Sequence, residues 1–161
     1  MAITAATLTT TTSESIVLNG VTYGNTITNT HTGIKEVRQS VITVPTNEIL
    51  LYNTVASIPT DGSAALELDH DLVKYVRLCN HDTTNFINLV IESEAGDEFM
   101  YKVNAGTVFL LGNHVDCMEA TTAGADVTFG TYASGTALKN ISASADTAAV
   151  DIELFIAVGT S

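Results

Sequence analysis

The residues with the clearest potential for chemistry are histidines beside aspartates. Three of the four histidines have an aspartate within two positions: His70, His81 and His114. Such groups bind zinc or iron when two or three of them converge on one ion. The sequence lacks a His-x-His pair, and His70 and His81 flank opposite ends of one predicted strand. We therefore expect solvated loop histidines and no metal or other cofactor, with a cupin-like metalloenzyme using His70 or His114 as an alternative.

Acidic pairs and nucleophiles do not form a catalytic pattern. The pairs Glu92/Glu94 and Asp97/Glu98 flank a predicted turn at Gly96, where charge keeps a loop solvated, and do not face each other across a sugar cleft. The sequence contains no Gly-x-Ser-x-Gly elbow and no phosphate-binding glycine pattern. These observations predict that the protein is not an enzyme and has no catalytic residues.

The two cysteines, Cys79 and Cys117, fall at or inside predicted strands, where cysteine is usually a small buried hydrophobic residue. The N-terminus lacks the basic and apolar regions of a secretory signal, which predicts synthesis in a cytoplasm and reduced thiols. A disulfide between the two is geometrically allowed, but nothing in this context supports it.

The charge balance argues against two classes of partner. Lys and Arg number 6 against 18 Asp and Glu, which gives a net charge of −12. Binding nucleic acid or an anionic membrane requires clustered cations, and here no two are adjacent. No apolar run approaches the length of a membrane span. In place of charge the chain has 25 threonines and 10 serines, so we expect neither nucleic acid nor membrane as a partner.

The secondary structure elements expected to position these residues are short β-strands. Turn signals recur every 8–12 residues, and no long window has helical periodicity. Asn19-Gly20 predicts a hairpin between strands at 14–18 and 21–28, and four threonines from Thr9 favour extended chain before it. Residues 25–33 are polar and turn-rich. Further strands are expected at 34–44, 48–52, 72–79, 86–92, 98–103, 107–111, 115–119, 126–132 and 150–158. The fold class is therefore all-β, an antiparallel β-sandwich or jelly roll.

The density of apolar residues divides the chain in two. Residues 1–44 are too poor in apolar side chains to bury a core, whereas residues 45–161 can do so. We therefore expect an N-terminal arm with a hairpin at 1–44 and a sandwich domain at 45–161. Such an arm completes its packing against its own domain or a neighbouring subunit.

Three segments resemble small β-sandwich virion proteins of tailed bacteriophages. In Tyr75–Ile91 a strand ending in Asn is followed by a polar loop and an apolar strand, and Phe99–Leu111 contains a strand closing in Asn-Ala-Gly. The opening Ser15–Gly24 is similar to the N-terminal hairpin of such proteins. The resemblance implies a capsid decoration (cement) protein, with a tail or baseplate component as the nearest variant.

That resemblance implies a location and partners. The protein would be made in the host cytoplasm and would bind the outside of the capsid, because an anionic chain repels DNA. Its partners would be the major capsid protein and copies of itself, as a homotrimer or another closed oligomer. The expected contact residues are apolar and lie in the arm: Ile3, Leu8, Ile16, Leu18, Val21 and Tyr23.

A receptor- or carbohydrate-binding β-module of a tail fibre or baseplate is the alternative function. It requires an exposed aromatic cluster, because sugar rings stack on aromatic faces. The candidates for that cluster are Tyr101, Phe129 and Tyr132.

Overall fold

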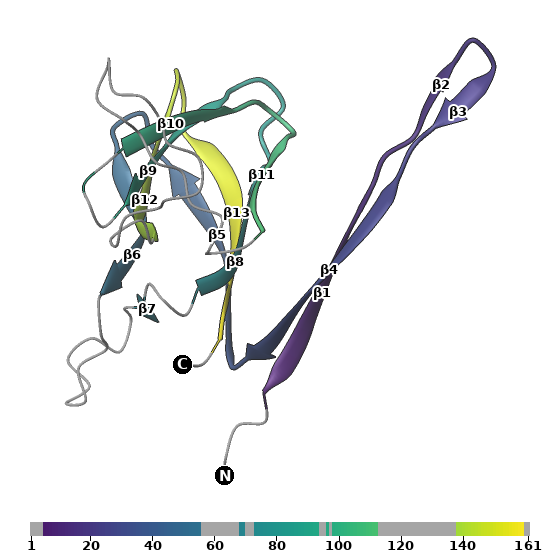
Figure 1. Ribbon diagram of the computed structural model, residues 1–161. Helices are drawn as coiled ribbons and strands as arrows, with labels where there is room; N and C mark the ends of the chain where they lie inside the picture. The colour runs from purple at the N-terminus through teal and green to yellow at the C-terminus, as the bar shows by residue number, and fades with distance from the viewer. Residues whose placement is uncertain are drawn as a thin grey trace, which may run out of the picture.

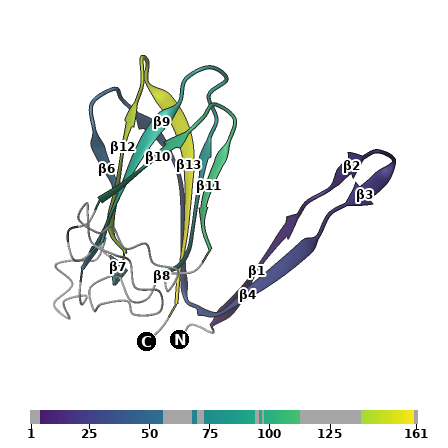
Figure 2. The same cartoon turned by 45° about the horizontal axis from the view of Figure 1, so that its top comes forward.

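The fold is all-β, as the sequence predicts. The computed structural model describes residues 5–55, 68–69, 73–93, 96, 98–112 and 138–159, and every regular element in these ranges is a β-strand. Two sheets form a sandwich, and a long two-stranded arm projects from it (Figures 1 and 2). The expected strands at 115–119 and 126–132 lie outside the described residues.

One layer is a five-stranded sheet with the order β10-β9-β12-β6-β7. Its strands are β6 (Ile49–Val55), β7 (Leu68–Asp69), β9 (Ile87–Ser93), β10 (Glu98–Val103) and β12 (Leu138–Ala145). The other layer is a four-stranded sheet with the order β11-β8-β13-β5. Its strands are β5 (Glu36–Val44), β8 (Val73–Asn80), β11 (Val108–Leu111) and β13 (Val150–Val158). Neighbours are antiparallel except β6 and β7, which pair in parallel.

The core lies between the two sheets and follows the alternation of the strands. On β13, Ile152, Leu154 and Ile156 are buried in it, and on β9 so are Ile87, Leu89 and Ile91. Each set lies on one face of its strand, because side chains two residues apart share one face of a sheet. The same core contains Val44 and Tyr52, so it joins residues from both halves of the chain.

Strand β8 departs from simple alternation at its start. Regular alternation would place Val73 on one face with Tyr75 and Arg77. Val73 packs instead in the core beside Val76. The pairing with β13 shifts register here, since Val158 opposes Val73 while Ala157 opposes Tyr75. This bulge inserts one extra residue and returns Val73 to the core side.

Strand β12 is missed by the sequence analysis, although it lies in the middle of the five-stranded sheet. It pairs with β6 on one side and β9 on the other. Its inward residues are Ile141, Ala143 and Ala145, all of them buried. Small Ala and Ser residues have weak strand propensity, which hides the period-two pattern.

The arm consists of two stacked two-stranded segments. The lower segment pairs β1 (Ala6–Ser13) with β4 (Thr26–Ile34), and the upper pairs β2 (Ile16–Leu18) with β3 (Val21–Tyr23). The prediction of a turn-rich segment at 25–33 is wrong, because β4 occupies it and pairs with the threonines of β1. Strand β5 belongs to the four-stranded sheet, so the projecting arm ends at Ile34 and is shorter than residues 1–44.

Candidate functional site

The arm closes in a tight turn that the sequence predicts. Asn19 and Gly20 both have positive φ, 51° and 77°, as a two-residue turn matched to twisted strands requires. Below the tip, the backbone of Gly24 passes close to Glu14. A Cβ on Gly24 would lie 2.1 Å from the carbonyl oxygen of Glu14. Only glycine fits there, so this close approach fixes the junction between the two segments of the arm.

The tip of the arm presents an apolar face to solvent. Ile16 pairs with Tyr23, and Leu18 pairs with Val21, so these four side chains lie on the same face of the hairpin. Their exposed fractions are 60%, 54%, 56% and 52% respectively. Val17, 67% exposed, lies on the opposite face. Four of the six contact residues expected from the sequence thus form one surface, called the tip face below.

The shaft of the arm is held by hydroxyl groups instead of a core. Thr11 and Thr28 face each other with their Oγ1 atoms 3.4 Å apart, and the Ser13 hydroxyl lies 3.1 Å from that of Thr26. Such cross-strand hydroxyl pairs stabilise a ribbon modestly, by about 0.2–1 kcal/mol each. The backbone N–H of Glu14 donates to the carbonyl of Asn25 and continues the ladder towards the tip. The threonines therefore stabilise the shaft, and the exposed apolar residues of the arm lie in the tip face.

The base of the arm packs on the outer face of the four-stranded sheet. Ile34, Tyr75 and Ala157 form a small buried cluster, and Leu8 and Phe155 pack against it. Leu8, expected as a contact residue for a partner, is thus half-buried against its own domain. Ile3 lies outside the described residues.

Aromatic side chains link this base to the sheet. The ring of Tyr75 lies 5.9 Å from the ring of His31 and 6.0 Å from that of Phe155. Burial raises the pKa of the Tyr75 phenol above its ordinary value, and the positive charge of Arg77 opposes that shift. The Arg77 guanidinium also lies 5.6 Å from the centre of the Phe155 ring, a cation–π contact. The arm therefore leaves the sandwich from a packed, defined base.

A cleft of about 360 Å³ separates the arm from the sheet beside β11. Its walls are Leu8, the threonines Thr9–Thr12 and Asn29 on the arm, and Tyr75, Arg77, Leu110, Gly112 and Phe155 on the sandwich. Hydroxyl and apolar side chains make up most of its described lining.

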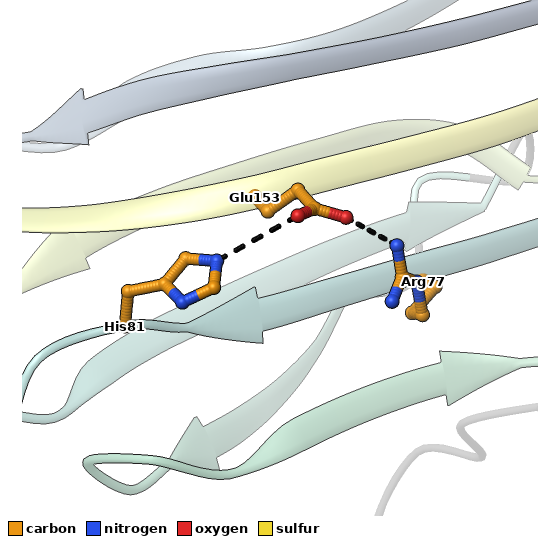
Figure 3. A network of polar contacts seen from close by, with 3 residues as sticks. All are labelled: Arg77, His81 and Glu153. Carbon is orange, nitrogen blue, oxygen red and sulfur yellow. Dashed lines mark hydrogen bonds and ion pairs between the residues drawn. The ribbon is translucent and has the colours of Figure 1, made fainter.

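Figure 3 shows an ionic network on the same outer face. Glu153 on β13 accepts a hydrogen bond from the Arg77 guanidinium on β8 and lies 3.8 Å from Nε2 of His81. His81 is 53% exposed, in line with the sequence expectation of a solvated loop histidine. The network ties β8 to β13, the strands that bear the base of the arm.

The loop after β8 is ordered by Asp82. Its carboxylate accepts hydrogen bonds from the backbone N–H groups of Thr84 and Asn85, at 2.6 and 2.7 Å. These bonds hold the pKa of Asp82 at about 2, below its usual value of 3.8. The loop also uses Asn80, whose buried amide donates to the carbonyls of Asn85 and Val103. Asp82 therefore has a structural role.

Two of the acidic residues near Gly96, Glu92 and Glu98, lie side by side on neighbouring strands. Glu92 accepts hydrogen bonds from Lys139 and Asn140, which hold the pKa of its carboxyl below the usual value. Glu98 lies opposite Glu92 in the ladder, and both line a shallow hollow of about 310 Å³ on the five-stranded sheet with Glu48. Glu94 and Asp97 lie outside the described residues.

Other candidates from the sequence are only partly placed. Cys79 is a free, half-buried thiol, and Cys117, His70 and His114 lie outside the described residues. Within the described ranges, no three His, Cys, Asp or Glu side chains are grouped to hold a metal ion. None of the described segments forms a helix long and apolar enough to cross a bilayer.

An aromatic row that the sequence analysis missed lies where β10 faces β11. Tyr101 lies between Phe99 and Phe109, with ring centroids 6.3 and 5.3 Å away. Phe99 and Tyr101 are partly exposed. Phe129 and Tyr132, expected to accompany Tyr101, lie outside the described residues. Alternation along β10 and β11 places these rings together, which a linear search for neighbouring aromatic residues does not reveal.

Comparisons with known proteins give no relative: no family model, no curated protein and no solved structure matches the chain.

Proposed function

We propose that this protein is a non-enzymatic structural protein of a tailed-phage virion, a decoration (cement) protein that binds the outside of the major capsid shell and bridges its subunits. The observation that carries the proposal is the tip face, four apolar side chains more than half exposed at the end of a projecting arm. An exposed apolar surface on an ordered element marks a contact site for another protein.

The charge distribution supports the arm as the contact element. Residues 1–34 contain one acidic residue, Glu14, and no Lys or Arg, whereas the other 17 acidic residues follow in the rest of the chain. A neutral tip loses little hydration energy on burial, because it has no ion to desolvate. The acidic body, by contrast, repels other anionic surfaces.

The shape of the arm suits bridging. Residues 6–18 form one side of the hairpin, which at about 3.3 Å per residue reaches roughly 40 Å. Both views show the arm leaving the sandwich on the side of β11 (Figures 1 and 2). An arm of this length would seat its tip on one capsid subunit while the sandwich rests on the next.

Capsid binding tests the proposal through substitutions at the tip. We expect Leu18→Asp to abolish co-sedimentation with capsid shells that lack this protein, because it places a charge in the apolar contact. The matched control is Val17→Asp, which adds the same charge on the opposite face of the same strand and should bind like wild type.

Two further variants make the result decisive. Tyr23→Asp should behave like Leu18→Asp. A chain that lacks residues 1–30 should still fold its sandwich but should no longer co-sediment with capsid shells. Wild-type binding by Leu18→Asp, or equal loss with Val17→Asp, would contradict the role of the tip face. A wild-type protein with no affinity for any shell would contradict the function.

The aromatic row favours a second candidate, a carbohydrate-binding module of a tail fibre or baseplate. Phe99 and Tyr101 are 38% and 42% exposed, and aromatic faces of this kind stack on sugar rings. Binding to a glycan array that is lost in Tyr101→Ala and kept in Leu18→Asp would support this function over capsid binding.

A further inference from the structure

The four-stranded sheet ends at β5 in an edge that pairs with no described strand. Strand β5 is nine residues long and hydrogen-bonds to β13 along one side only. Folded proteins usually cover such an edge or interrupt it with proline or charge, since its backbone groups attract another strand. The nearest proline, Pro45, follows the last residue of β5 and interrupts nothing.

The outer face of β5 carries two exposed valines. Val37, Gln39 and Val41 oppose Ala157, Phe155 and Glu153 of β13, on the face away from the core. Val37 and Val41 are 53% and 70% exposed. They flank Gln39 symmetrically, two residues to either side.

The charge balance of β5 favours contact with a second copy of this chain. The chain has a net charge of −12, which repels copies of itself. Strand β5 carries one acid and one base, Glu36 and Arg38, and the two form an ion pair of 2.6 Å. The strand itself therefore has no net charge, although Asp151 and Glu153 of β13 lie beside its second half.

We propose that β5 pairs antiparallel with β5 of a second copy about a two-fold axis at Gln39. In this register Val37 of each copy lies opposite Val41 of the other, and residues 36–42 pair throughout. Cross-strand pairs of β-branched residues stabilise antiparallel sheets. Each Arg38 is drawn towards its own Glu36, away from the axis, so the two guanidinium groups point apart.

The two-fold contact leaves the tip of the arm free. Although β4 ends one residue before β5, the shaft of the arm shares a cleft with β11, which is the opposite edge of the sheet from β5. Figure 2 shows the arm projecting on the side of β11. An isologous contact closes at two copies, so this proposal replaces the sequence-based expectation of a homotrimer with a dimer. Such a dimer displays two tip faces, which would strengthen binding to a repeating surface by avidity.

Cross-linking tests the register. With Cys79 and Cys117 replaced by serine, Gln39→Cys should form a disulfide-linked dimer on mild oxidation, because directly opposed strand residues fall within disulfide distance. The matched control is Thr43→Cys on the same exposed face, whose counterpart in the second copy lies roughly 27 Å away along the strand in this register. Equal cross-linking of both variants, or none with Gln39→Cys, would overturn the proposal.

Sedimentation tests the interface without new thiols. The wild type should sediment at twice the chain mass of 16.9 kDa, and Val41→Lys should raise the dimer dissociation constant at least tenfold. Leu50→Lys, at a site 58% exposed on the other sheet, should remain dimeric. A monomeric wild type would overturn the proposed dimer. If the chain that lacks residues 1–30 remains dimeric, the dimer interface does not depend on the arm, so the dimer and the capsid contact of the arm are tested independently.

Discussion

The rings of His31 and Tyr75 meet with their centroids 5.9 Å apart, and this contact joins the projecting arm to the sandwich. One comes from β4 and the other from β8, so the direction of the arm depends on side chains far from its tip. The Nε2 atom of His31 is buried there without a hydrogen-bond partner among the described residues.

Replacing this histidine should stabilise the protein. His31→Phe keeps an aromatic ring against Tyr75 and removes a buried polar nitrogen, whose desolvation costs roughly 1–3 kcal/mol. We expect the free energy of unfolding in urea to rise by about 1 kcal/mol. A loss of stability would show that Nε2 has a partner outside the described residues.

Truncation of the partner ring should have the opposite effect. Tyr75→Ala removes the centre of the cluster formed with Ile34 and Ala157. Loss of a buried aromatic side chain costs about 3–5 kcal/mol. Urea denaturation should report a loss of that order, and hydrogen exchange should show faster exchange in β4. If β4 keeps its protection, the base does not hold the arm.

The crossing at Gly24 gives a local prediction. Gly24→Ala forces a methyl group against the Glu14 carbonyl, so the two sides of the hairpin must move apart there. Amide exchange should accelerate in residues 13–26 while the sandwich keeps its protection. Gly112→Ala is the control, because its added Cβ meets no atom within 4 Å. Identical exchange in both variants would contradict the close approach.

The carboxylate of Asp82 predicts a pH dependence. Its pKa in the folded protein, about 2, lies below the usual 3.8, so the charged form favours the fold. This stabilisation is complete at pH 7, begins to fall as the pH approaches 3.8, and is lost as the pH falls through about 2. Asp82→Asn should therefore melt below wild type at pH 7, and the difference should shrink at pH 2. A difference of the same size at pH 7 and pH 2 would contradict this role of the Asp82 carboxylate.

The middle of the five-stranded sheet should resist larger side chains. Ala143 is fully buried on β12, opposite Leu89 of β9. Ala143→Val adds two methyl groups to a closed core, which typically costs about 1–3 kcal/mol. The same change at the exposed Ala149 should be close to neutral in urea denaturation. Equal costs would mean that β12 is not central to the core.

Local patterns in the sequence predict much of this fold. Asn19-Gly20 has a single favourable backbone geometry, and the alternation in β13 assigns its inward face without further information. The tip face follows from the position of that turn and from the alternation of strand side chains, since Ile16, Leu18, Val21 and Tyr23 are spaced by two on either side of the turn.

Other elements depend on partners that are distant in the chain. The polar strand β4 forms because β1 lies opposite it. Strand β12 contains small residues because it lies in the middle of its sheet, where there is little space for larger side chains. The sequence predicts that Leu8 contacts a partner because it is an apolar residue of the arm, but it packs against the cluster that contains Tyr75, far along the chain. The strand propensity of single residues does not predict such pairings, because the stabilising energy comes from tertiary contacts.

The position of β13 has a consequence for biosynthesis. Strand β13 lies between β5 and β8, and its residues Phe155 and Ala157 help to form the base on which the arm packs. The hairpin at residues 6–34 can close early on the ribosome, since its contacts are local, but that base is incomplete until β13, more than 100 residues later, has been translated. A chain that terminates before β13 would lack that base, so an arm held in its native direction reports that β13 has been made and paired.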